Sequence, residues 1–112
     1  MNNNSQINLF ITLDEKKMPD KIEWQADDAQ FSGRKESKTM MLSLWDKKEN
    51  VTFSIDLWTK EMTVNEMQIH FYQMLIKMAD TFERATNNSE TAKMIRRFSL
   101  DFAKQTGIQS KY

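Results

Sequence analysis

The chain has 112 residues, and its sixteen lysine and arginine side chains balance sixteen aspartate and glutamate side chains. This length suffices for one domain with a core that needs no covalent cross-links, and the zero formal net charge excludes a strong long-range attraction to nucleic acid or to an anionic membrane. The chain contains no cysteine, which excludes disulfides, thiolate metal sites, a cysteine nucleophile and a lipid anchor on cysteine.

Targeting signals are not evident in the sequence. Residues 1–6 lack the basic and apolar regions of a signal peptide. The longest nearly apolar run, residues 71–79, is too short to span a bilayer. The absence of cysteine fits a reducing compartment. We therefore expect a cytoplasmic protein without membrane insertion.

Two alternating segments near the N-terminus predict an antiparallel hairpin. Apolar and polar residues alternate along residues 7–13 and again along residues 22–26, and the polar turn 14–19 connects the two segments. Both apolar sets must share one face of the hairpin, which selects a register. The expected register pairs Ile11 with Trp24 and Leu13 with Ile22.

A second hairpin is predicted after a polar segment, residues 27–38, which shows no clean period and is expected to be the main loop. Residues 40–44 and 51–58 alternate, and the loop 47–50 separates them. A slip by one residue would place apolar side chains opposite polar ones, so the pattern selects the register. The expected pairs are Met40 with Leu57, Leu42 with Ile55, and Leu44 with Phe53.

The segment that follows predicts a long helix with an unusually broad apolar surface. Thr63-Val-Asn-Glu66 is a capping box, so the helix begins there, and helical periodicity continues to about Thr86. Apolar residues occupy roughly two-thirds of its circumference, which is more than one small sheet should need. The main face holds Met67, Phe71, Met74, Leu75, Met78 and Phe82, and Ile69, Tyr72, Ile76 and Ala79 extend it around one side.

A second helix is predicted to begin near Asn88 or Ser89 and to stop at Gly107, with an apolar stripe of Ala92, Ile95, Phe98, Phe102 and Ala103. The elements together predict a single α+β domain over residues 1–108 and a frayed tail over residues 109–112. Its expected fold is a four-stranded antiparallel sheet of two hairpins, followed by two C-terminal helices packed on one face in ββββαα order. The predicted core comprises Leu42, Leu44, Phe53, Ile55, Met67, Phe71, Met74, Met78, Phe82, Ile95, Phe98 and Phe102.

Polar residues with catalytic or metal-binding potential are few. His70 is the single histidine, and a metal site would need it together with Glu66 and another carboxylate. The acidic pairs at residues 14–15 and 27–28 fall in turns, and general acid–base catalysis needs a carboxylate in an environment that shifts its pKa. The two glycines cannot form a glycine-rich phosphate loop. We expect no catalytic residue, no metal ligand and no cofactor-binding residue.

Two tryptophans mark a candidate interaction surface. Trp45 and Trp58 lie on the hairpin face opposite to the predicted core, together with Met41. Large exposed apolar patches are rare on monomers, so this face needs cover. The loop 27–38 could supply it through Phe31, or another chain could supply it. The sequence leaves both alternatives open.

The excess apolar surface also predicts self-association. One sheet covers about one stripe of the first helix, which leaves Ile69, Tyr72 and Ile76 as candidates for exposure. A two-fold homodimer is the commonest arrangement that buries such surface. We expect the contact at the tryptophan-bearing hairpin face or its edge, with the three helix residues as second choice.

Five segments carry a family resemblance: Leu13–Glu15, Pro19–Trp24, Met40–Asp46, Ile55–Met62 and Met78–Asn87. Through them the chain resembles the gliding-motility protein GldC family of Bacteroidetes over nearly its whole length. The resemblance implies a small soluble protein associated with the gliding machinery, without a catalytic motif to transfer. The expected function is that of a non-enzymatic accessory acting by protein–protein contacts, with a partner from the gliding machinery or a second copy.

Two other classes of function remain as alternatives. The element order is similar to that of the SecB export chaperones, which suggests a binder of unfolded secretory chains. An exposed apolar groove for extended peptides would favour this alternative, and a compact patch would favour the accessory. A small-ligand-binding or enzymatic domain would require a deep pocket with convergent polar groups.

Overall fold

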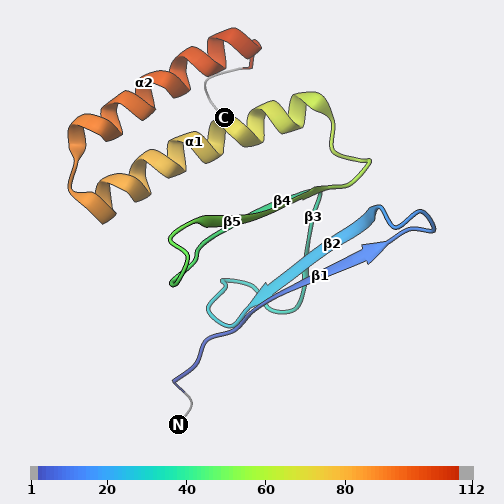
Figure 1. The fold of residues 1–112 in the computed structure, drawn as a ribbon. Helices are drawn as coiled ribbons and strands as arrows, with labels where there is room; N and C mark the ends of the chain where they lie inside the picture. Colours follow the sequence, from blue (N-terminus) through green and yellow to red (C-terminus); the bar gives the residue numbers. More distant parts are fainter. Residues whose placement is uncertain (1–2, 109–112) are drawn as a thin grey trace. The chain divides into compact units, whose positions relative to one another are not determined.

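The computed structural model describes residues 3–108, which form five strands followed by two helices (Figure 1). The chain divides into two compact units, Met1–Met62 with the strands and Thr63–Tyr112 with the helices. The elements are β1 (Ile7–Leu13), β2 (Pro19–Ala26), β3 (Lys35–Ser37), β4 (Thr39–Trp45), β5 (Thr52–Trp58), α1 (Val64–Thr86) and α2 (Ser89–Thr106). This arrangement confirms the α+β class and the two C-terminal helices.

Two of the expectations concern how the two units are arranged relative to each other. A single domain over residues 1–108, and helices packed on the sheet, involve both units and stay predictions. The expected frayed tail, residues 109–112, lies outside the described residues.

The first sheet contains three antiparallel strands in the order β1-β2-β3. Leu9 pairs with Trp24 and Ile11 with Ile22, so the apolar side chains share one face as predicted. The predicted register is nevertheless wrong by two residues. The period of a strand is two residues, so this error leaves every side chain on its correct face.

The turn between β1 and β2 explains the error, because it is shorter than the sequence suggests. The Asp14 carboxylate accepts hydrogen bonds from the backbone N–H groups of Lys16 at 2.8 Å and Met18 at 3.0 Å. The Asp14 N–H donates to the Met18 carbonyl at 2.8 Å, and Lys17 adopts a left-handed φ of 63°. β2 consequently begins at Pro19, before the first residue of the predicted strand.

The predicted four-stranded sheet is wrong, because the strands form a three-stranded sheet and a separate two-stranded sheet. Part of the predicted loop is the short strand β3, which pairs with β2. Only Lys38 separates β3 from β4, and there the pairing partner changes from β2 to β5.

Side-chain chemistry accounts for this change of partner. Continuing the register of β2 and β3 would place Lys21 opposite Lys38 and Pro19 opposite Met40. Like charges on opposite residues are unfavourable, and proline has no N–H to donate to the ladder. The Lys38 carbonyl instead accepts two hydrogen bonds from Thr59, from its N–H at 2.8 Å and from its hydroxyl at 3.1 Å.

The second sheet, β4 and β5, has the predicted register. Met40 pairs with Leu57, Leu42 with Ile55, and Leu44 with Phe53. Its turn also depends on an aspartate: the Asp46 carboxylate accepts hydrogen bonds from the N–H groups of Lys48 at 3.0 Å and Glu49 at 2.7 Å.

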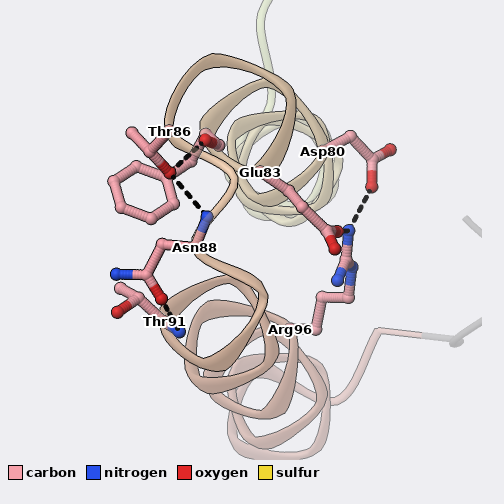
Figure 2. A network of polar contacts seen from close by, with 7 residues as sticks. Asp80, Glu83, Thr86, Asn88, Thr91 and Arg96 are labelled. Carbon is pink, nitrogen blue, oxygen red and sulfur yellow. Dashed lines mark hydrogen bonds and ion pairs between the residues drawn. The ribbon is translucent and has the colours of Figure 1, made fainter.

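The helices begin and end where their capping residues predict. Thr63 and Glu66 form the expected capping box, with both hydrogen bonds at 3.0 Å. α1 ends at Thr86, as predicted, and its C-cap Asn87 has a left-handed φ of 58°. Asn88 caps α2 by accepting a hydrogen bond from the Thr91 N–H at 3.0 Å (Figure 2). α2 ends at Thr106, and its C-cap, the predicted Gly107, has a left-handed φ of 77°.

Small side chains line the contact between the two helices. Ala92, Ser99 and Ala103 are buried on one face of α2. Arg96 lies on the same face by helical periodicity, and its guanidinium contacts Asp80 at 3.0 Å and Glu83 at 2.7 Å on α1 (Figure 2). This face of α2 is therefore directed at α1.

Burial of the predicted core between the sheet and the helices involves both units and stays a prediction. Six of its large residues are 40% to 58% exposed: Leu44, Phe53, Ile55, Phe71, Met78 and Phe98. Among residues 3–108, the buried residues are Ile22, Thr59, Tyr72, Ala79, Ala92, Ser99 and Ala103. Periodicity identifies side chains that share a face, but it does not show whether another element covers that face.

Candidate interaction surface

The β4–β5 hairpin has an apolar face and a mixed face, which we call the tryptophan face. The apolar face consists of Met40, Leu42, Leu44, Phe53, Ile55 and Leu57. The tryptophan face consists of Thr39, Met41, Ser43, Trp45, Thr52, Ser54, Asp56 and Trp58. Alternation along both strands assigns every residue to one of the two faces.

The two tryptophans lie at opposite ends of their face. Trp45 pairs with Thr52 beside the turn, and Trp58 pairs with Thr39 at the other end of the ladder. Their side chains are 67% and 57% exposed, respectively, whereas Met41 is half-buried. The structure thus presents two separate indoles, and exposed tryptophans are typical anchors of protein–protein contacts.

Polar residues occupy the middle of the tryptophan face. The hydroxyl oxygens of Ser43 and Ser54 are 3.5 Å apart across the two strands, and the neighbouring pair is Met41 with Asp56. A partner that covers both indoles must therefore also accommodate hydroxyl groups and a carboxylate.

Phe31, which the sequence offered as cover for this face, contacts the other sheet. Its ring packs edge-to-face on Trp24 of β2, with centroids 5.0 Å apart and an interplanar angle of 89°. Arg34 lies over the ring of Phe10 at 3.5 Å and forms an ion pair with Glu23 at 3.5 Å. These contacts attach the predicted loop to β1 and β2, and the ring of Phe31 packs on Trp24.

The second-choice surface belongs to α1 in the helical unit. Tyr72 is only 6% exposed, and Ile69 and Ile76 are half-buried. By helical periodicity Tyr72 and Ile76 share a face with Ala79 and Glu83, the residue that contacts Arg96 of α2. Tyr72 is therefore buried within this unit, and the assignment of Ile69, Tyr72 and Ile76 to an interface stays a prediction.

Sequence reasoning assigned Leu44, Phe53 and Ile55, on the apolar face of the hairpin, to the core. All three are more than half exposed.

A hollow of about 490 Å³, lined by charged side chains of both signs, lies beside the β1–β2 turn; Asp14, Asp20 and Lys60 are among them. The hydrogen bond from the Met18 backbone N–H is the main reason that the pKa of Asp14 is lowered. The positive charge of Lys60, 3.7 Å away, also lowers this pKa. A carboxylate with a lowered pKa remains ionised at neutral pH, which suits turn stabilisation better than proton transfer.

Among residues 3–108, no three histidine, cysteine, aspartate or glutamate side chains are grouped to hold a metal ion. His70 lies half-buried on α1. In the same part of the chain, neither helix is long and apolar enough to cross a membrane.

These observations define an α+β protein whose β4–β5 hairpin carries two exposed tryptophans on one face. Comparison with known families assigns it further: the sequence profile of the family described as gliding motility-associated protein GldC-like matches residues 19–108. The chain therefore belongs to the GldC-like family of gliding motility-associated proteins. No curated protein and no solved structure matches it.

Proposed function

We propose that this protein is a non-enzymatic accessory of bacterial gliding motility that acts in the cytoplasm through protein–protein contacts. Family membership supports the association with gliding. The exposure of Trp45 and Trp58 on one hairpin face is the observation that supports action by contact. Buried tryptophans contribute strongly to binding energy at protein interfaces, because they combine large apolar area with few rotatable bonds.

The proposed partner is a protein of the gliding machinery that buries both indoles. It would also donate hydrogen bonds to Asp56 and pair with the serine hydroxyls between the tryptophans, since polar groups left unpaired in an interface weaken binding. No comparison supports the alternative of an export chaperone, and we do not propose it.

The test is replacement of both tryptophans in a gliding bacterium that carries this protein. The variant Trp45→Ala/Trp58→Ala should abolish gliding and the recovery of a gliding-machinery protein in pull-downs analysed by mass spectrometry. Loss of two anchors of about 2 kcal/mol or more each weakens binding by about a thousandfold.

The matched control is Met94→Ala/Leu100→Ala, which truncates two exposed apolar side chains on α2. It should leave gliding and partner recovery unchanged. A folded, normally expressed tryptophan variant that supports wild-type gliding would contradict the proposal.

A further inference from the structure

The β4–β5 sheet is incomplete by the usual standard for sheets. It has only two strands, and no described strand pairs with the outer edge of β5. An isolated two-stranded sheet is marginally stable in water, and further strands or packing against a helix usually stabilise it. The outer edge of β5 therefore offers a row of backbone groups to a further strand.

Two hydrogen bonds determine which residues of β5 point to that edge. The Asp46 N–H donates to the Val51 carbonyl at one end of the ladder, and the Thr59 N–H donates to the Lys38 carbonyl at the other, both at 2.8 Å. Hydrogen-bonded pairs alternate along an antiparallel ladder, so Phe53, Ile55 and Leu57 bond to β4. The backbone groups of Thr52, Ser54, Asp56 and Trp58 consequently point outward.

The β5 edge also lacks the features that normally prevent pairing between chains. It contains no lysine, no proline and no register shift. The outer edge of β1 differs, since its pairing with β2 shifts register between Thr12 and Leu13 and its sheet already has three strands. We propose that β5 pairs antiparallel with β5 of a second copy of this chain, forming a four-stranded sheet across a two-fold axis.

The side chains of β5 select a register centred on Ile55. In that register Ile55 lies opposite Ile55 of the second copy, Phe53 opposite Leu57, Ser54 opposite Asp56, and Thr52 opposite Trp58. Apolar residues thus meet apolar residues, and no like charges are opposed. All seven residues of β5 take part.

Neighbouring registers are less favourable. A shift by one position would place Phe53 opposite Asp56 and mix the two faces. Centring the pair on Asp56 would oppose two carboxylates. Centring it on Ser54 would place Trp58 opposite Asn50, in the turn and beyond the end of the strand.

Cysteine cross-linking tests both the pairing and the register, because the native chain has no cysteine. Residues at position 55 would form a non-hydrogen-bonded pair, whose Cα atoms lie about 4.5 Å apart and within disulfide range. Ile55→Cys should form a covalent dimer of twice 13.3 kDa on mild oxidation. The control Leu57→Cys, on the same face of the same strand, should remain monomeric under the same denaturing conditions of analysis.

Proline substitution provides a second test. Ser54→Pro removes an outward N–H without removing a hydrogen bond to β4, and should weaken dimerisation by about tenfold or more in light scattering across a concentration series. Ser43→Pro is its matched control: Ser43 lies opposite Ser54, and its N–H points to the outer edge of β4. This control should dimerise like the wild type.

Several results would overturn the proposal. They are a wild-type mass near 13.3 kDa at high micromolar concentration, equal cross-linking at positions 55 and 57, or a Ser43→Pro variant that loses dimers while Ser54→Pro retains them. Cross-linking at Ser54→Cys in place of Ile55→Cys would overturn the Ile55-centred register.

Discussion

The two sheets of the strand unit begin alike and are completed differently. Each contains a hairpin whose turn is closed by an aspartate carboxylate that accepts two backbone hydrogen bonds, Asp14 in the first and Asp46 in the second. The first sheet gains β3, and Ile22 in its central strand is 1% exposed. The second gains no strand, and Ile55 in β5 is 51% exposed. Equivalent alternating patterns therefore lead to different degrees of burial.

The largest expected difference between the sheets is in the cost of truncating these isoleucines. Ile22→Ala should lower the free energy of unfolding by about 2–5 kcal/mol, because it removes a fully buried side chain and leaves a cavity. Ile55→Ala should cost less than about 1 kcal/mol in the monomer, since half of its surface already contacts water. Urea unfolding at low protein concentration measures both. Equal costs would show that the two sheets are equally well packed.

The aromatic contact of the predicted loop should show the next largest effect. Phe31→Ala removes the edge-to-face contact with Trp24 and should cost about 1–3 kcal/mol, from lost burial together with the loss of the aromatic pair. Trp58→Ala in the second sheet is the comparison, and because its indole is mostly exposed it should change monomer stability less. The comparison fails if Trp58→Ala proves the more destabilising change in urea.

The turns of the two sheets offer a substitution that stabilises one more than the other. Lys17 and Asn50 both have left-handed φ angles, 63° and 56°. Lysine is strained in this conformation, whereas asparagine tolerates it and glycine adopts it freely. Lys17→Gly should therefore raise the unfolding free energy by about 0.5–1 kcal/mol, and Asn50→Gly should change it by a smaller amount. Thermal denaturation of both variants checks the order.

The smallest expected effect depends on pH and involves the first turn. The pKa of Asp14 is lowered from its ordinary value of 3.8 by hydrogen bonds, chiefly from the Met18 N–H. A carboxyl whose pKa is lower in the folded state stabilises that state above the unfolded value, and this contribution is lost as the pH falls through the folded value. Asp14→Asn should thus destabilise the protein at neutral pH and approach wild-type stability in acid. A difference in urea midpoint that does not depend on pH would contradict this assignment.

Patterns within one hairpin predicted its register well when the turn length was also evident. The register of β4 and β5 follows from three apolar pairs and a short loop. The register of β1 and β2 was misjudged by two residues, because hydrogen bonds to Asp14 closed the turn earlier than its polar sequence suggested. β3 was missed, since three residues carry no period and its structure depends on pairing with β2.

The candidate interaction surface was only partly predictable. Alternation correctly placed Trp45, Trp58 and Met41 on one face of the hairpin. It did not reveal that Phe31 contacts Trp24, nor that Tyr72 is buried. Both facts depend on residues that approach one another only in the folded unit.

The sequence alone determined the helix ends and the assignment of side chains to faces. The capping box at Thr63 and the left-handed Gly107 depend on hydrogen bonds between residues three or four positions apart, so a short segment contains the necessary information. Tertiary structure decided which faces are covered and where the sheets divide. Burial and strand pairing depend on residues distant in the chain, as at Lys38, where Thr59 supplies the hydrogen bonds that mark the change of partner.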